Sequence, residues 1–210
     1  MISKPLIFNE QKKFKKVERI EVKRCFVISQ YIRHYDKGKK RYIPELSPEE
    51  FQKRLNQAKK IVLDFSETEL DELIAGEYKK RLKAYNACDW YRGNVFSDEV
   101  GVWKKAGGLP LQWTEGSLKE TAEKVKSALQ DSSHPELIMR AKRAIPRIKK
   151  HFDIIENEPY LYPIILPGGT MERKELQRMK GDIDDGNMRS IAMAVSGKMK
   201  LNAYIGVYKK

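Results

Sequence analysis

Three segments near the end of the chain decide its fold: YLYPIIL at residues 160–166, DIDDGNMRSIAMAVSG at residues 182–197, and AYIGVY at residues 203–208. The first and the last are short apolar runs, which are typical of buried strands. In the middle segment, apolar residues recur at positions i, i+3, i+4 and i+7 of a helix, namely Met188, Ile191, Ala192 and Val195. The sequence therefore predicts a strand, a tight turn, a short one-faced helix and a final strand.

The turn before this helix predicts an anion-binding site. The first amides of a helix have no intrahelical acceptor and carry partial positive charge, so a phosphate fits in front of them. Glycine has no Cβ and lets an anion approach the backbone, while an arginine in the first turn adds a charged, bidentate contact. The residues expected to bind phosphate are Gly186, Asn187, Met188, Arg189 and Ser190.

Three carboxylates, Asp182, Asp184 and Asp185, come just before the turn. Carboxylates beside a phosphate repel it unless a divalent cation bridges the two. We therefore expect these aspartates to be catalytic, with Mg²⁺ as cofactor and Asp184 as its ligand. The alternative stays open that Asp-Gly is an ordinary turn in which Asp185 caps the helix.

The order of these elements resembles the ParB/sulfiredoxin superfamily. In that superfamily a strand of the form P-I-x-V leads to D-G-x-x-R, an alanine-rich helix, a glycine and a strand, and here Pro163-Ile164-Ile165 leads to Asp185-Gly186-Asn187-Met188-Arg189. The resemblance covers about residues 144–208. It implies a loop that holds nucleotide phosphates, with a nucleoside triphosphate (ATP or CTP) as ligand, and it carries the motif's glycine and arginine over to Gly186 and Arg189.

Departures from the family pattern exclude some of its branches. Sulfiredoxins need a cysteine before a histidine in this loop, where the chain has Asn187 and Met188. Partition proteins usually have a glutamate after the glycine, and asparagine cannot act as a base, which argues against a clamp-type CTPase. Kinase-like members tend to carry histidines here, and this loop has none. An insert at residues 168–180 is expected to bring further charged residues near the site.

The chain is strongly basic, with a net charge of +13 over 210 residues. Residues 1–60 hold 17 lysines and arginines against 7 acidic residues, so most of the excess lies there. Lysines neutralise phosphates and interleaved tyrosines can stack on bases, which favours a nucleic-acid surface. The expected contacts are Lys12, Lys13, Lys15, Lys16, Lys39, Lys40 and Arg41. The alternative, a solvated face with a basic arm, stays open.

Helix-start signals organise the rest of the chain. A serine followed three residues later by glutamate forms a capping box, and this occurs at Ser47, Ser66, Ser117 and Ser133. These boxes predict helices to about residues 60, 87, 130 and 145, with Pro146 interrupting or restarting the last one. Before them, the β-branched and aromatic run at residues 22–32 predicts a strand.

Residues 89–114 lose the helical period and contain three tryptophans, several glycines and a proline, which predicts irregular strands and turns. We place a domain boundary there, with a basic N-terminal region at residues 1–113 and a ParB/sulfiredoxin-like domain at residues 114–210. The expected fold class is α+β: a small mixed sheet or partly open barrel with flanking helices, preceded by a basic, mostly helical region.

Two cysteines, Cys25 and Cys88, cannot form a disulfide framework and are expected to be reduced core thiols. No apolar run approaches the roughly 20 residues of a membrane helix, and the first residues lack the apolar region of a signal peptide. We therefore expect a cytoplasmic protein without a membrane partner.

The leading functional hypothesis is a nucleotide-binding protein that acts on or beside nucleic acid, with Mg²⁺-dependent hydrolysis or transfer of phosphate. Two alternatives remain: a small-molecule or nucleoside kinase of the same fold, whose basic surface steers an anionic substrate, and a non-catalytic DNA-binding adaptor that grips backbone phosphate.

Overall fold

The computed structural model describes residues 14–34, 45–131, 135–167 and 181–209. These residues form one mixed sheet with helices around it, which confirms the α+β expectation. The strand order across the sheet is β1-β2-β6-β4-β5-β3. The strands are β1 (Lys15–Val17), β2 (Cys88–Phe96), β3 (Val100–Gly101), β4 (Ile164–Leu166), β5 (Gly181–Asp185) and β6 (Lys200–Tyr208).

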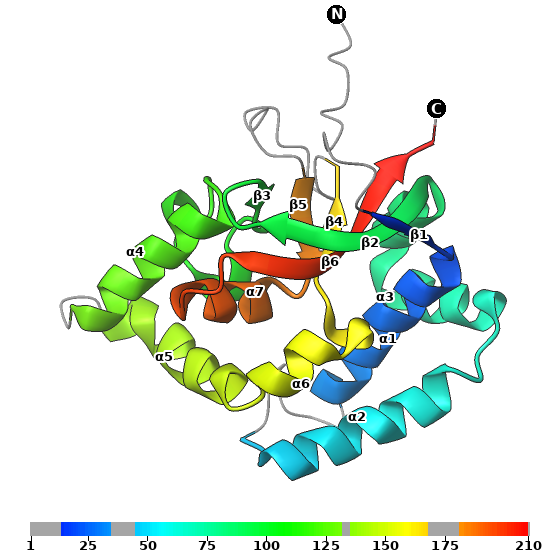
Figure 1. Cartoon of the computed structure of the whole chain (residues 1–210), viewed down its shortest axis with the longest axis horizontal. Coiled ribbons are helices and arrows are strands. Elements are labelled where there is room, and N and C mark those ends of the chain that lie inside the picture. Colours follow the sequence, from blue (N-terminus) through cyan, green and yellow to red (C-terminus); the bar gives the residue numbers. More distant parts are fainter. Residues whose placement is uncertain (1–13, 35–44, 132–134, 168–180, 210) are drawn as a thin grey trace, which may run out of the picture.

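The helices lie mostly beneath the sheet in Figure 1, with α4 at its left end and α3 at its right. They are α1 (Arg19–His34), α2 (Pro48–Val62), α3 (Glu67–Asn86), α4 (Leu118–Gln130), α5 (Pro135–Lys149), α6 (Phe152–Asn157) and α7 (Asn187–Val195). Short 3₁₀ helices connect them: η2 (Ala106–Gly108), η3 (Leu111–Trp113) and η4 (Pro159–Leu161). None of the helices that the structure describes is long and apolar enough to cross a bilayer.

Three of the expected capping boxes are present. Ser47, Ser66 and Ser117 each accept a hydrogen bond from the amide of the glutamate three residues later, whose carboxylate returns to the serine amide. Ser133 lies outside the described residues. The expected interruption at Pro146 is wrong, because α5 continues through this proline to Lys149.

The strand expected at residues 22–32 is also wrong, because α1 covers this segment. Its side chains at Val22, Cys25, Phe26 and Ser29 are all buried, at the i, i+3, i+4, i+7 spacing of a helix. The β-branched residues suggested a strand, and burial of this one face against the sheet and α3 outweighed that weak preference.

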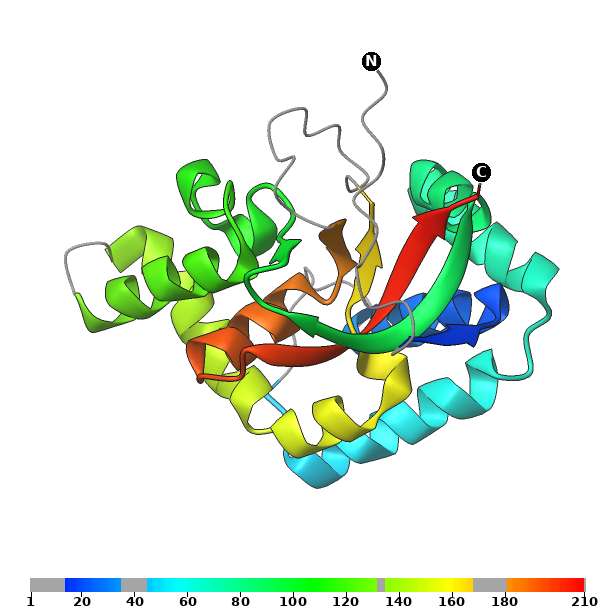
Figure 2. The same cartoon turned by 45° about the horizontal axis from the view of Figure 1, so that its top comes forward.

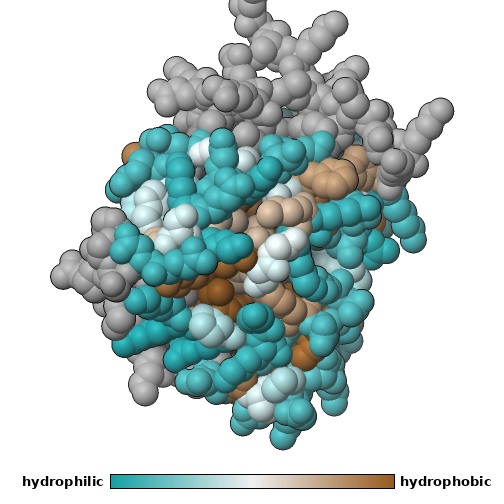
Figure 3. All heavy atoms as spheres, turned by 60° about the vertical axis from the view of Figure 1, so that its left-hand side comes forward, coloured by the Kyte–Doolittle hydropathy of each residue, from teal (hydrophilic) through white to brown (hydrophobic). Residues whose placement is uncertain are grey.

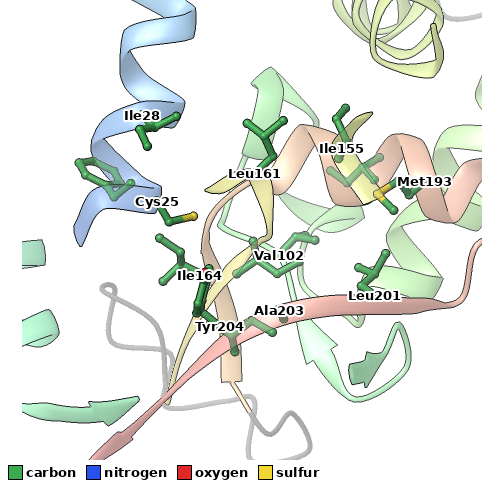
Figure 4. Close-up of a cluster of buried hydrophobic side chains, with 14 of the residues drawn as sticks. Cys25, Ile28, Val102, Ile155, Leu161, Ile164, Met193, Leu201, Ala203 and Tyr204 are labelled. Atoms are coloured by element: carbon green, nitrogen blue, oxygen red, sulfur yellow. The ribbon is translucent and has the colours of Figure 1, made fainter. Parts of the chain in front are cut away.

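Strands β2 and β6 form a long antiparallel ribbon that curves through the molecule (Figure 2), pairing all nine residues from Cys88 opposite Tyr208 to Phe96 opposite Lys200. At one end Trp90 is buried on the side of Tyr85 in α3, donating to its carbonyl oxygen at 3.0 Å. At the other end Leu201 and Ala203 of β6 lie on the side facing Val102 and Met193 (Figure 4). The ribbon thus buries opposite faces at its two ends, because side chains alternate along a strand.

One hydrophobic core joins the N-terminal and C-terminal halves, from Val22 to Ile205. The first half contributes β2 to the same sheet as β6. The boundary expected between residues 113 and 114 therefore does not separate two cores among the described residues. Cys25 and Cys88 are buried free cysteines, as expected.

The deciding segments fold as predicted in outline. Strand β4 lies between β5, to which it is antiparallel, and β6, to which it is parallel. Strand β5 ends at Asp185, and α7 begins directly after Gly186. Together β4, β5, α7 and β6 form a compact unit that places the start of α7 next to the end of β5.

Candidate functional site

Gly186 makes the corner between β5 and α7. Its φ of 90° lies in the left-handed region, and a Cβ built on it would come within 3.1 Å of the Pro163 Cα atom. Glycine is therefore required both for the turn and for the close approach to Pro163. No side chain caps the start of α7, so its first amides retain their partial positive charge.

Arg189 points into the protein. Only 6% of this residue is exposed; its Nη2 donates to the Asp185 Oδ2 atom at 3.1 Å, and its Nε donates to the Leu161 carbonyl oxygen at 3.1 Å. The guanidinium thus ties α7, the end of β5 and η4 together. The expected contact of this side chain with a phosphate is replaced by an internal ion pair.

The alternative interpretation expected the Asp185 side chain to cap α7, and the structure shows no such hydrogen bond. Its carboxylate accepts hydrogen bonds from Ser29 Oγ at 2.8 Å and from Gln30 Nε2 at 3.3 Å, both on α1, in addition to the Arg189 contact. The carboxylate is buried, and charge-assisted hydrogen bonds compensate the loss of its hydration. Asp185 therefore anchors the corner to α1.

Asp184 belongs to a second buried pair. Its Oδ2 atom lies 2.6 Å from Arg81 Nε and accepts a hydrogen bond from the Tyr85 hydroxyl at 2.8 Å. The Arg81 guanidinium lies over the rings of Phe26, at 4.6 Å from the centroid, and Trp103, at 5.5 Å. Burial raises the pKa of Asp184, and the pair with Arg81 opposes this shift. The pair links β5 to α3 and to the segment after β3.

The aspartates do not fit the expected magnesium site. Asp184 and Asp185 each already face an arginine, and they bond to different helices, α3 and α1. Asp182 is buried as well. No group of three histidine, cysteine or acidic residues that could hold a metal occurs among the residues that the structure describes. Asp184 and Asp185 therefore do not form an open magnesium site.

A glycine-containing loop, Trp103–Gly108, lies over the start of α7. The Trp103 amide donates to the Asn187 Oδ1 atom at 2.8 Å, and the Asn187 Nδ2 atom donates to the Ile183 carbonyl oxygen at 3.0 Å. Gly107 packs so closely on Met188 that an added Cβ would lie 2.1 Å from the Met188 sulfur. Asn187 and Met188 therefore position this loop through their side chains.

The loop carries two lysines that the sequence reasoning did not assign to the site. Lys104 and Lys105 lie in the chain between the two contacts with α7, and Lys105 is exposed. Lys105, Gly107 and Gly108 all have positive φ values, so the loop turns sharply there. The adjacent pair of lysines and pair of glycines was the available signal. Because the glycines are not followed by Lys-Ser or Lys-Thr, as in a P-loop, the segment was interpreted as part of an irregular stretch of strands and turns.

The remaining expected residues are only partly described. Ser190 is fully buried, and Lys15 and Lys16 are exposed on β1 at the edge of the sheet. The other expected nucleic-acid contacts, Lys12, Lys13, Lys39, Lys40 and Arg41, lie outside the described residues, as does the insert. The insert joins β5 at Gly181, which is the end of this strand opposite to Gly186.

A small cavity of about 20 Å³ lies on the inner side of the Arg189 cluster, lined by Ser29, Phe51, Leu161, Arg189, His151 and neighbouring aliphatic side chains. This volume has room for about one water molecule. The His151 ring stacks on Phe51 at 4.3 Å, and neither ring nitrogen has a hydrogen-bond partner among the described residues. The cavity is too small for a nucleotide.

His151 predicts an acid-sensitive stability. Burial, with a smaller effect of Lys150, lowers the pKa of His151. A histidine whose pKa is lowered by folding stays neutral in the folded state, while the unfolded chain binds a proton below pH 6.5. The folded state therefore loses stability as the pH falls through and below that value. In urea unfolding at pH 7.5 and 5.5, the wild type should lose more stability than His151→Phe; equal losses would contradict this.

Comparison with known proteins adds no relative: no family model, no curated protein and no solved structure matches the chain. The resemblance to the ParB/sulfiredoxin superfamily therefore stays a prediction, which rests on the motif at residues 163–189 and on the order of elements around it.

Proposed function

We propose that the protein binds a nucleotide at the start of α7, through the phosphates of the nucleotide. We propose further that it acts on or beside nucleic acid. Three features support the proposal: the uncapped start of α7 after Gly186, the two lysines of the loop Trp103–Gly108, and the net charge of +13. Helix amides and lysines are the groups that recognise phosphate in many unrelated folds.

The observation that carries the proposal is the hydrogen bond from the Trp103 amide to the Asn187 side chain at 2.8 Å. It holds a basic loop against the one helix start that the motif singles out, although these residues are 84 positions apart in the chain. In this arrangement Lys104 and Lys105 supply the positive charge, and Arg189 holds the corner from behind without touching the ligand.

The buried pairing of the aspartates favours a second candidate over the kinase hypothesis. Asp184 and Asp185 are each paired to an arginine, so neither of these two carboxylates is free for general-base work. A non-catalytic adaptor that grips backbone phosphate of nucleic acid needs none. Nucleotide consumption decides between the adaptor and the leading hypothesis, because the adaptor binds without turnover.

The proposal predicts a selective loss of nucleotide binding in Lys104→Glu/Lys105→Glu. Ligands that bind only the folded state raise the melting temperature by mass action, so ATP, CTP, GTP and UTP are compared at millimolar concentration with and without Mg²⁺. Wild type should melt higher with at least one of them, and the double variant should lose about 10-fold or more in affinity, because two attractive charges become repulsive.

The matched control is Lys79→Glu/Lys80→Glu, which makes the same charge change on exposed lysines of α3. It should keep nucleotide affinity within about two-fold. An equal loss of affinity in both double variants would mean that net charge alone causes the effect. If none of the four nucleotides raises the melting temperature of the wild type, the proposed function is wrong.

A further inference from the structure

The outer ends of β2 and β6 present an open half of one sheet face. Phe96 lies opposite Lys200, and Asn94 lies opposite Asn202 in the antiparallel register. All four side chains are exposed, and they share one face because alternate residues of a strand point the same way. We call these four residues, with the neighbouring Tyr162, the open half-face.

Helix α1 covers the same face further along the ribbon. There Tyr204 donates its hydroxyl to Glu21 of α1 at 2.7 Å, and Arg92 donates to the same carboxylate at 3.2 Å. The cover ends before Asn94 and Asn202. Among the described residues, the open half-face is therefore left exposed, where β2 ends and β6 begins (Figure 1).

The open half-face combines aromatic rings, amides and a cation. Half of Phe96 is exposed, and the Lys200 Nζ atom lies 5.9 Å from the centre of its ring. On the other side, the Asn202 Nδ2 atom donates to the Tyr162 hydroxyl at 3.4 Å. Asn202 of β6 thus contacts Tyr162, which precedes β4, and it lies opposite Asn94 of β2.

This combination fits unpaired bases. Bases stack on aromatic rings, amide groups hydrogen-bond to base edges, and lysines neutralise the phosphates between them. Lys15 extends the positive charge along the ribbon, because it is exposed and lies opposite Arg92 in β1. The Glu99 carboxylate, three residues after the end of β2, accepts a hydrogen bond from the Phe96 amide at 3.1 Å.

An extensive apolar protein interface fits this side of the molecule less well. Figure 3 shows the molecule with its left-hand side in Figure 1 turned forward; hydrophilic side chains make up most of the described surface in this view, with a strip of apolar ones between them. Stable protein interfaces usually have a larger apolar centre. The net charge of +13 also favours a polyanion over a protein of ordinary charge.

We propose that the open half-face binds single-stranded nucleic acid, with bases stacked on Phe96 and Tyr162, base edges at Asn94 and Asn202, and phosphate at Lys200. The inference rests on the proposed function, which supplies nucleic acid as the partner. It adds that the nucleic acid is single-stranded and names the surface that binds it. It does not depend on nucleotide binding at α7.

The test measures fluorescence anisotropy of labelled dT15, rU15 and a 15-base-pair DNA duplex with the full chain. Wild type should prefer the single strands to the duplex. Phe96→Ala should weaken binding of the single strands by about 5- to 100-fold, the range for loss of one stacked base. The matched control, Tyr208→Ala, removes an aromatic side chain of similar exposure from the other end of β6 and should stay within about two-fold.

A second variant keeps the test decisive if Phe96→Ala lowers stability. Lys200→Glu should weaken binding and reduce the dependence of log affinity on log salt by about one unit or more. Lys53→Glu, at an exposed lysine of α2, should change both less. The proposal is overturned by three results: equal effects of Phe96→Ala and Tyr208→Ala, tighter binding of the duplex, or no binding of single strands at low salt.

The two proposals fail in different ways. If Lys104→Glu/Lys105→Glu leaves nucleotide binding intact while Phe96→Ala abolishes single-strand binding, the α7 site is wrong and the open half-face stands. The reverse pattern rejects the open half-face and leaves the nucleotide site in place.

Discussion

Replacing Arg189 by methionine should lower the free energy of unfolding by about 3 to 5 kcal/mol, the usual cost of removing one partner of a buried ion pair. The substitution removes the Arg189 charge from the buried Asp185 carboxylate, to which the described residues Ser29 and Gln30 donate neutral hydrogen bonds. It also removes the donor to the Leu161 carbonyl oxygen. Urea unfolding followed by circular dichroism measures the change.

Two further variants separate the buried pair from a general effect of charge. Arg143→Met removes an exposed arginine of α5 and should change stability by no more than about 0.5 kcal/mol. Asp185→Asn/Arg189→Met removes both charges and should recover part of the loss, because no uncompensated charge remains buried. An Arg189→Met protein as stable as the wild type would mean that the guanidinium does not hold the corner.

The second large effect is expected at Arg81. Arg81→Met should also cost about 3 to 5 kcal/mol, because the buried Asp184 carboxylate loses its cation and, among the described side chains, keeps the hydrogen bond from the Tyr85 hydroxyl. The variant also removes the cation that lies over the Trp103 ring. We therefore expect weaker nucleotide binding in addition to lower stability, since Trp103 begins the loop that carries Lys104 and Lys105.

Arg81→Lys supplies the conservative comparison. Lysine keeps the charge beside Asp184 but lacks the planar group that lies between two rings. It should recover most of the stability and less of the nucleotide affinity. If Arg81→Met unfolds at the same urea concentration as the wild type, the ion pair between Arg81 and Asp184 does not stabilise the folded state.

The local motif was readable from the sequence because its signals are local. The Asp-Gly turn, the helical spacing from Met188 to Val195 and the serine capping boxes are all set by residues close together in the chain. Gly186 was singled out for its missing Cβ, and its φ of 90° with Pro163 at 3.1 Å gives that choice a physical basis.

The surroundings of the motif could not be predicted from the sequence, because residues far away in the chain form them. Arg189 and Asp185 were expected to face a ligand, yet they bond to each other, and Ser29 and Gln30 of α1, about 155 positions away in the chain, donate to Asp185. The segment containing Ser29 was itself predicted as a strand, so no such contact could be foreseen. Arg81 and Trp103 likewise reach the corner only through the tertiary fold.

The sequence predicted that the protein is basic, but it did not predict where the lysines next to α7 lie. The excess charge of residues 1–60 pointed to seven lysines and arginines between residues 12 and 41, and of these seven the structure describes Lys15 and Lys16. The lysines next to α7 come from the irregular segment after β3, where composition gave no indication of the neighbour. The net charge of a sequence indicates that it favours anionic partners. The position of the binding site depends on which segments the fold brings together.

Amide NMR of the labelled protein, titrated with the nucleotide that gives the largest melting shift, tests the phosphate site most directly. The account predicts that the largest shift changes fall on the amides of Asn187, Met188 and residues 104–108, with saturation at the concentration that raises the melting temperature. Saturating changes that leave these amides in place, and fall elsewhere on the surface, would contradict it.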